Sequence, residues 1–145
     1  PQAVSGGVDP SWALAFGGAA IVGHVFSLWV GFRGGKGVAT STGVFLALAP
    51  WAVAVGFAVW AGLVAATRIV SVGSIGAAVA LPLAVLFTPH EGGRATVVFT
   101  FALGLFVIWA HRSNIGRLLR GEERPIGPGG SRSGAGASGP EGGTR

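Results

Sequence analysis

The chain has 145 residues, of which 50% are hydrophobic and only 10% charged, and its mean hydropathy is +0.66. Soluble domains carry about 25% charged residues, so this composition excludes an ordinary soluble fold. The net charge of +5 points to a defined membrane orientation and anionic ligands rather than nucleic acid, and the absence of Cys excludes disulfide and thiolate chemistry.

Four long stretches contain no charged side chain, namely residues 10–32, 38–67, 69–90 and 95–110. A membrane-spanning helix needs about 20 apolar residues, and no soluble core of this size needs four such runs. A secretory signal peptide does not explain runs that recur along the whole chain. We therefore predict an all-α fold, a polytopic transmembrane helical bundle.

The first spanning helix is predicted over residues 11–30, after a polar extracytoplasmic lead-in at residues 1–10. The chain begins with Pro1 and contains no Met, so we expect it to lack the N-terminal segment of a longer protein. The glycine-rich residues 31–37 end this helix, because each glycine costs about 1 kcal/mol in a helix.

The next stretch, residues 38–67, can form one long tilted helix or two short ones that turn near Pro50, since an internal proline costs ~3 kcal/mol or more. Two passes would place Asp9, Glu91 and Arg94 on one face. The basic residues of the opposite face would then be Arg33, Lys36, Arg68, Arg112, Arg117, Arg120 and Arg124. The positive-inside rule favours this sorting and puts the basic face in the cytoplasm. Each half would be short for a span and would need tilt or bilayer thinning.

Two more spans are predicted over residues 69–88 and 96–110, which brings the total to about five. Residues 112–123 are basic and are expected to form a helix that leaves the membrane. The composition of residues 124–145 cannot bury apolar surface, so we predict a disordered cytoplasmic tail. The transmembrane domain therefore covers residues 11–123.

The glycine-rich loop before residue 38 is a candidate phosphate cradle. The backbone N–H groups around Gly34, Gly35 and Gly37 can form an anion-binding nest, the next helix adds the positive end of its dipole, and Lys36 adds a full charge. It is not a Walker A loop, because no Ser or Thr follows Lys36. The alternative is a tight interhelical turn with positively charged residues on the cytoplasmic side, and residue types alone favour the two equally.

Other polar residues lie near the same membrane surface. His24 is within the first predicted helix, where the simpler interpretation is a hydrogen bond to neighbouring backbone. Arg68 and Ser71 share one helical face. His111 and Asn114 lie one turn apart at the end of the last span, an arrangement that suits a general base and an orienting amide. The alternative for this pair is an interfacial helix cap.

The acidic residues limit the possible chemistry, because none lies within a predicted span; they are Asp9, Glu91, Glu122, Glu123 and Glu141. No zinc-protease or EF-hand pattern occurs, so no metal site is expected. A proton-coupled pump would normally need a carboxylate within the membrane.

Three motifs, in order, resemble the bacterial acyl-phosphate:glycerol-3-phosphate acyltransferases of the PlsY type. GHVF at residues 23–26 with GFRGGKGVAT at 31–40 resembles the second signature of that family. Residues 68–74 resemble the segment that opens a later helix of that family. HRSNIGRLLRGEE at residues 111–123 resembles its third signature. The family has seven spanning helices and a first signature rich in Gly, Asn and Ser. Nothing here matches that signature, so the first two helices are expected to be missing and the fragment alone inactive.

The resemblance implies transfer of a fatty acyl group from acyl phosphate to the 1-hydroxyl of glycerol 3-phosphate, at the cytoplasmic face of a bacterial inner membrane and without a cofactor or metal. It implies catalytic roles for His111 and Asn114. The implied phosphate-binding residues are Gly34, Gly35, Lys36, Gly37, Arg68 and Ser71, with His24, Thr40 and Arg117 in support. The alternatives are an organic-phosphate transporter, which predicts a polar midplane site, and a non-catalytic membrane protein.

Overall fold

The computed structural model describes residues 10–27 and 35–127, and these ranges contain helices but no strand. The six helices are α1 (Pro10–Val25), α2 (Val38–Leu48), α3 (Pro50–Thr67), α4 (Val70–Phe87), α5 (Gly93–Ala110) and α6 (Arg112–Leu119). Residues 1–9, 28–34 and 128–145 lie outside the described part, so the predicted lead-in, most of the glycine-rich loop and most of the predicted tail lie outside it as well.

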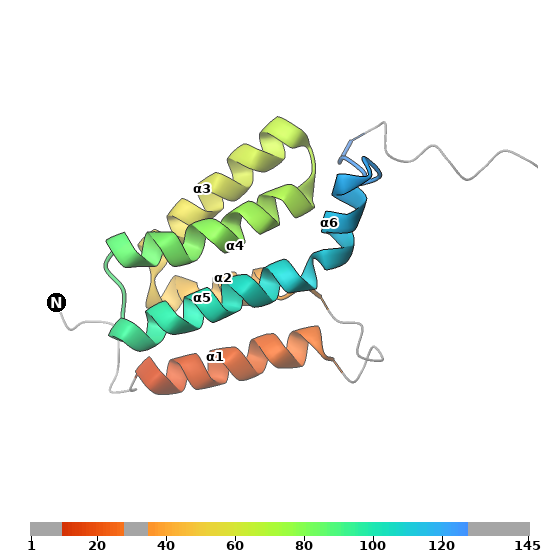
Figure 1. Ribbon diagram of the computed structural model, residues 1–145. Coiled ribbons are helices and arrows are strands. Elements are labelled where there is room, and N and C mark those ends of the chain that lie inside the picture. Colours follow the sequence, from red (N-terminus) through yellow and green to blue (C-terminus); the bar gives the residue numbers. More distant parts are fainter. Residues whose placement is uncertain (1–9, 28–34, 128–145) are drawn as a thin grey trace, which may run out of the picture.

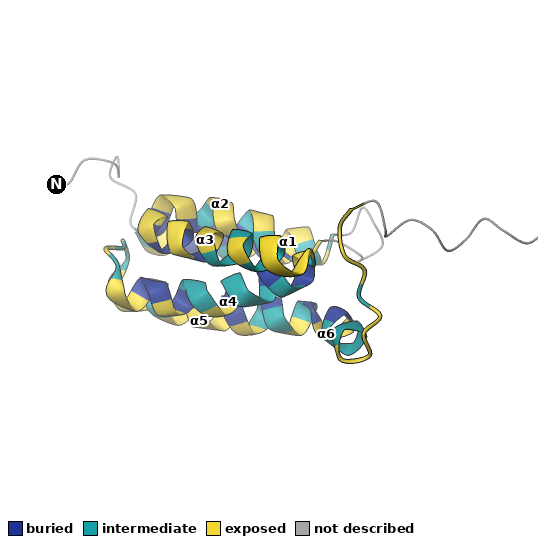
Figure 2. Ribbon diagram, turned by 90° about the horizontal axis from the view of Figure 1, so that it is seen from above, coloured by how far each residue is buried: buried dark blue, intermediate teal, exposed yellow. Residues whose placement is uncertain are grey.

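Helices α1 to α5 run in alternating directions between two ends of one bundle (Figure 1). Seen from above, α1, α2 and α3 form one layer and α4 and α5 the other (Figure 2). We call the end that holds α6 and the α3–α4 turn the basic end. Its described cations are Lys36, Arg68, Arg112, Arg117, Arg120 and Arg124. Glu91 and Arg94 lie at the opposite end, so the charge sorting expected for two passes over residues 38–67 is observed for the described charges, while Asp9 and Arg33 lie outside the described residues.

The break between α2 and α3 falls at Ala49, whose backbone leaves the helical region with φ −149° and ψ 62°. Pro50 follows as a first-turn residue of α3, where its missing N–H costs nothing. The backbone N–H of Glu91 donates to the carbonyl oxygen of Leu48 over 2.8 Å, which fastens the turn to the α4–α5 loop. Both helices of this stretch were expected to be short for a membrane span. This is correct for α2, which has 11 residues, but wrong for α3, which has 18.

Three helices are long and apolar enough to cross a membrane, namely α3, α4 and α5 with 18 residues each. At 1.5 Å per residue, each is about 27 Å long, close to the ~30 Å hydrocarbon core of a bilayer. Helices α1 and α2 run between the same two ends but have 16 and 11 residues. Large apolar side chains such as Phe16, Val98 and Leu105 are exposed. The predicted all-α membrane bundle is confirmed, and three of the five expected spans reach full length.

Glycines allow α4 to pack closely against both of its neighbours. A methyl group at Gly73 would come within 2.9 Å of the carbonyl oxygen of Trp60 on α3, and one at Gly104 on α5 would come within 2.6 Å of the carbonyl oxygen of Ala78. Small residues at helix interfaces are typical of membrane bundles. Helix α3 packs most closely on α4 and much less on α2, which leaves space between α2 and α3.

Two predicted helix ends are wrong. Helix α1 ends at Val25 rather than at residue 30, and α6 ends at Leu119 rather than at residue 123. After α6, Gly121 adopts a left-handed conformation with φ 69°, which turns the chain back toward the bundle. The N–H of Ile126 then donates to the carbonyl oxygen of Arg68 over 2.7 Å, so the first residues of the predicted tail lie against the α3–α4 turn.

Candidate functional site

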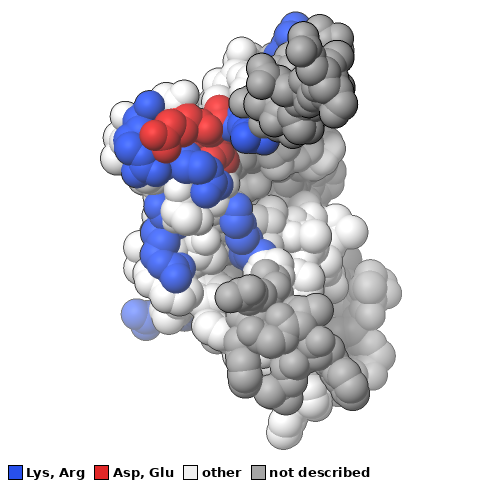
Figure 3. Space-filling view, turned by 90° about the vertical axis from the view of Figure 1, so that its right-hand side faces the viewer, with Lys and Arg blue, Asp and Glu red and all other residues white. Residues whose placement is uncertain are grey.

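A polar cavity of about 460 Å³ opens at the basic end of the bundle. It is lined by His24, Gly35, Lys36, Gly37, Val38, Ala39, Val70, Ser71, Ser74, His111, Asn114, Glu123 and Arg124. Figure 3 views this end and shows Lys and Arg side chains over much of its described surface, with acidic side chains among them on one side. The chemistry-bearing residues of α1, α2, α4 and the α5–α6 region therefore meet in one place.

Two helices begin at this cavity, α2 at Val38 and α4 at Val70. The first four N–H groups of a helix have no partner within the helix, and its N-terminus carries a partial positive charge. Gly37 allows the tight start of α2, because its φ of 79° is a conformation that side chains disfavour. Its carbonyl oxygen accepts from the N–H of Ser41 over 2.8 Å and from the Ser41 hydroxyl over 2.6 Å. This arrangement favours an anion near the two helix starts.

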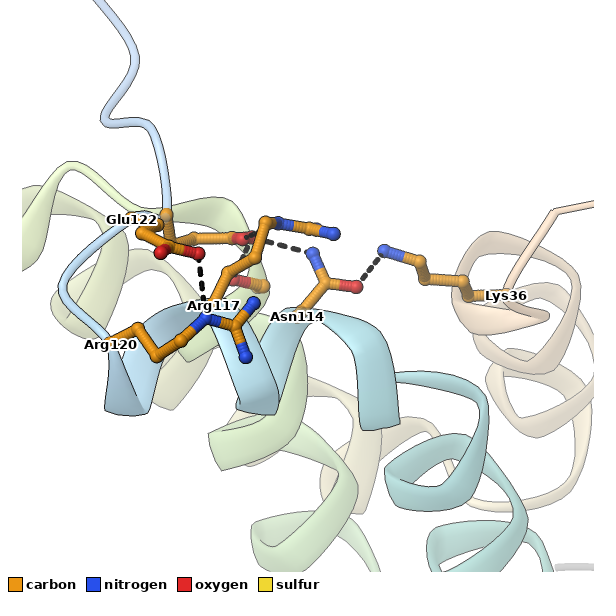
Figure 4. A network of polar contacts seen from close by, with 7 residues as sticks. Lys36, Asn114, Arg117, Arg120 and Glu122 are labelled. Atoms are coloured by element: carbon orange, nitrogen blue, oxygen red, sulfur yellow. Dashed lines mark hydrogen bonds and ion pairs between the residues drawn. The ribbon is translucent and has the colours of Figure 1, made fainter.

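Lys36 and Asn114 are joined directly across the cavity (Figure 4). Lys36 Nζ donates to Asn114 Oδ1, and Asn114 Nδ2 donates to Glu123 Oε1 over 2.5 Å. The oxygen and the nitrogen of the Asn114 amide are therefore both hydrogen-bonded, which fixes the orientation of the side chain. Burial lowers the pKa of Lys36; the charge of Glu123 opposes this change, and that of Arg117 adds to it.

Glu123 anchors this network, although the sequence interpretation did not select it as a site residue. Its carboxylate accepts from the Ser71 hydroxyl over 2.7 Å, from Asn114 Nδ2 and from Arg117 Nε over 2.6 Å. Burial alone would raise the pKa of Glu123, but the hydrogen bonds from Arg117, Asn114 and Ser71 outweigh burial and hold the pKa at about 2. Glu123 is therefore ionised at neutral pH.

His111 is buried, with 2% of its surface exposed, and it caps the end of α5 beside the cavity. Its Nδ1 lies 2.8 Å from the carbonyl oxygen of Val107. A carbonyl only accepts, so Nδ1 carries the hydrogen and Nε2 of the neutral ring can accept a proton. Burial lowers the pKa of His111, as does the charge of Lys36, while the Val107 bond and Glu123 oppose the change. The neutral form is thereby favoured near pH 7.

His24 and Gly35 fit together on the α1 side of the cavity. A methyl group at Gly35 would overlap Nε2 of His24, so the imidazole packs directly on the glycine backbone. A side chain at residue 35 would therefore require His24 to move away from its position at the cavity.

The remaining predicted site residues that the structure describes do not line the cavity. Gly34 is outside the described residues. Arg68 is exposed at the α3–α4 turn, with a left-handed φ of 59°, and does not line the cavity. Thr40 is on the first turn of α2 but is not a lining residue, and Arg117 is 41% exposed and bound to Glu123. Within the described ranges, no three His, Asp or Glu side chains lie close enough to hold a metal ion.

An apolar groove of about 480 Å³ joins the polar cavity. It runs between α2 and α3 with α4 and α5 as its floor, and the residues common to both spaces are Val38, Ala39, Val70 and Ser74. On α4, the groove extends from Val70 to Leu81, a length of about 16 Å at 1.5 Å per residue. A molecule with an anionic head and an aliphatic chain would fit the combined space.

Comparison with known proteins identifies relatives of the whole bundle. The family model described as glycerol-3-phosphate acyltransferase matches residues 3–121. The chain is 45% identical over 129 residues to the glycerol-3-phosphate acyltransferase of Synechococcus elongatus, covering 86% of this chain and 60% of the relative. It is 50% identical over 109 residues to that of Syntrophotalea carbinolica, covering 75% and 55%.

Two crystal structures of PlsY (YgiH), described as an integral membrane glycerol 3-phosphate acyltransferase, have the same fold. The glycerol 3-phosphate form gives a TM-score of 0.72 at 35% identity and covers 79% of this chain and 56% of that one. The lysophosphatidic acid form gives 0.70 at 35% identity and covers 77% and 56%. The chain thus spans little more than half the length of the proteins that it matches.

Proposed function

Since this chain belongs to the glycerol-3-phosphate acyltransferase family, we propose that the protein transfers a fatty acyl group from acyl phosphate to the 1-hydroxyl of glycerol 3-phosphate. The products are lysophosphatidic acid and inorganic phosphate, and the reaction belongs to phospholipid synthesis. The two crystal structures of PlsY are described as its glycerol 3-phosphate form and its lysophosphatidic acid form. These descriptions support glycerol 3-phosphate as the acceptor and lysophosphatidic acid as the product.

The observation that carries this proposal is the junction of the polar cavity with the apolar groove. Both substrates bear a phosphate and one also bears an aliphatic chain. The phosphates need fixed positive charge and N–H donors, which Lys36 and the starts of α2 and α4 supply. The acyl chain needs an apolar channel that begins at the reacting carbon, and the groove begins where Ala39 and Ser74 line both spaces.

The geometry of His111 supports the following chemical step. The acceptor hydroxyl oxygen attacks the carbonyl carbon of the acyl phosphate and forms the ester bond, while its proton passes to His111 Nε2. The bond between that carbon and the phosphate oxygen breaks, phosphate leaves with the electron pair, and the proton can follow it. Acyl phosphate is already an activated anhydride, so catalysis consists mainly of positioning and electrostatic stabilisation by Lys36 and Asn114.

The transporter alternative predicts a polar site at the bilayer midplane. In the described part of the bundle, the buried hydroxyls of Thr96 and Thr100 lie between the two ends, and they donate to the carbonyl oxygens of Glu91 and Thr96. The polar groups that remain for a ligand gather at the basic end. The arrangement therefore favours surface chemistry over passage through the bundle.

We place the protein in the inner membrane of a bacterium, with the basic end in the cytoplasm, because cytoplasmic loops carry the excess of Lys and Arg. Glycerol 3-phosphate and inorganic phosphate are water-soluble, so a site at the membrane surface is accessible to both. The described basic end carries the polar cavity as well as most of the positive charge.

Ala39 offers a direct test of site and orientation, because it is exposed and lines both spaces. In the complete protein, with any other cysteines replaced, Ala39→Cys should react with a membrane-impermeant maleimide only from the cytoplasmic side. Glycerol 3-phosphate should slow that reaction by about tenfold or more, the protection expected at about ten times Kd. Arg120→Cys, exposed at the same end outside the cavity, should react from the same side without protection. Reaction of Ala39→Cys from the outer side, or no protection, would reject the proposed site.

A further inference from the structure

We propose that Gly56 determines how long an acyl chain the protein accepts. This inference rests on the proposed function, in which the apolar groove holds the acyl chain of acyl phosphate. Gly56 is buried on α3 and lines the groove, so a side chain there would occupy space that the chain needs.

Gly56 lies deep in the groove, opposite Leu81. A methyl group at Gly56 would lie 3.8 Å from Cβ and Cδ1 of Leu81 and 4.0 Å from the carbonyl oxygen of Ala77. These are ordinary van der Waals distances, so the contact between α3 and α4 does not itself require glycine. At Gly73, by contrast, an added methyl would meet the carbonyl oxygen of Trp60 at 2.9 Å, so close packing there does require glycine. The absence of a side chain at residue 56 instead keeps the groove open.

Gly56 lies so far along the groove that only long acyl chains reach it. From Val70, where groove and polar cavity meet, to Leu81 is about 16 Å along α4. A carbon–carbon single bond is about 1.5 Å long, so a ten-carbon chain extends less than about 15 Å and ends before Gly56. A palmitoyl chain is six carbons longer and reaches it.

On α3, the groove extends beyond Gly56 only to Val53, and past that point the bundle is filled by its own side chains. Phe45, Ala52 and Val85 are completely buried in the core, and the hydroxyl of Thr100, at the end of the groove, is bonded to the carbonyl oxygen of Thr96. A chain that is blocked at residue 56 therefore loses the contacts of its last methylenes.

The test compares palmitoyl phosphate with decanoyl phosphate as donors for the complete protein. Gly56→Leu should lower the ratio of kcat/KM for palmitoyl over decanoyl by about tenfold or more, since each buried methylene contributes a factor of about four. The decanoyl rate should change little. Gly56→Ala should shift the ratio in the same direction by about fourfold. The matched control is Gly62→Leu on the same helix, where an added methyl meets nothing within 4 Å; its ratio should equal that of the wild type.

The measurements distinguish failure of the proposed function from failure of the role of Gly56. If the wild type transfers neither chain to glycerol 3-phosphate, the proposed function fails. If the wild type is active and Gly56→Leu is folded, as judged by its decanoyl rate, an unchanged ratio overturns the role of Gly56. If Gly56→Leu does not fold, an unchanged ratio in active Gly56→Ala overturns it instead.

Discussion

Replacing Lys36 with alanine should lower kcat/KM for glycerol 3-phosphate by about 10²–10³-fold, as does the loss of one preorganised charge-stabilising donor in other enzymes. Lys36 Nζ is held at the cavity by Asn114 Oδ1, between the starts of α2 and α4. Lys36 is the only lysine in the sequence, and it lines the polar cavity. Without it, the phosphates would lose a charge-assisted donor, and the Asn114 amide would lose the partner that orients its oxygen.

Steady-state kinetics of the complete protein, in membranes or detergent, would measure this effect. Arg120→Ala is the matched control, because it also removes a positive charge from the basic end. Arg120 is exposed, pairs with Glu122 at the surface over 2.7 Å and does not line the cavity, so its kcat/KM should stay near that of the wild type. Equal losses in both variants would indicate a general effect of surface charge rather than a site at Lys36.

Replacing His111 with asparagine should lower kcat by about 10²–10⁴-fold, the contribution expected of a positioned general base. The Nδ1–Val107 bond leaves Nε2 as the proton acceptor. Because burial lowers the pKa of His111, the neutral ring persists to lower pH than for a free histidine. The wild-type rate should therefore fall only as pH drops below the ordinary histidine pKa of about 6.5, and this acid limb should be absent from His111→Asn.

His90 is the matched control for this substitution. It lies at the opposite end of the bundle, and its Nδ1 also contacts a backbone carbonyl, that of Thr88 at 2.9 Å. His90→Asn should keep both the rate and the acid limb. If His111→Asn keeps the acid limb while losing rate, a substrate phosphate oxygen takes the proton and His111 only orients the acceptor.

Hydrophobicity and charge alone predicted the bundle well. The uncharged stretches and the sorting of basic residues indicated alternating helices, and the break at residue 49 follows from Pro50. The end of α6 was missed although its signal is local: Gly121 has a left-handed φ of 69°, and the N–H groups of Gly121 and Glu122 donate to the carbonyl oxygens of Leu118 and Arg117, the pattern of a glycine C-cap. The family resemblance is confirmed by the match over residues 3–121.

The site was predicted in part. Gly35, Lys36, Gly37, Ser71, His111 and Asn114 were selected from motifs, and they meet in one cavity; their catalytic and binding roles stay predictions. Glu123 was missed because its contact with Ser71 joins residues 52 positions apart, and a glutamate at the end of a basic segment is ordinarily a surface residue. Arg117 was selected through the family resemblance as a supporting residue, and its guanidinium is engaged by Glu123.

We propose that this protein moves an acyl group from acyl phosphate to glycerol 3-phosphate at the junction of the polar cavity and the apolar groove. The most direct measurement follows labelled glycerol 3-phosphate with the purified complete protein and palmitoyl phosphate as donor. We expect labelled lysophosphatidic acid and one inorganic phosphate per product, with both lost in Lys36→Ala and His111→Asn. Uptake of glycerol 3-phosphate into vesicles without lysophosphatidic acid, or undiminished product in both variants, would contradict the account.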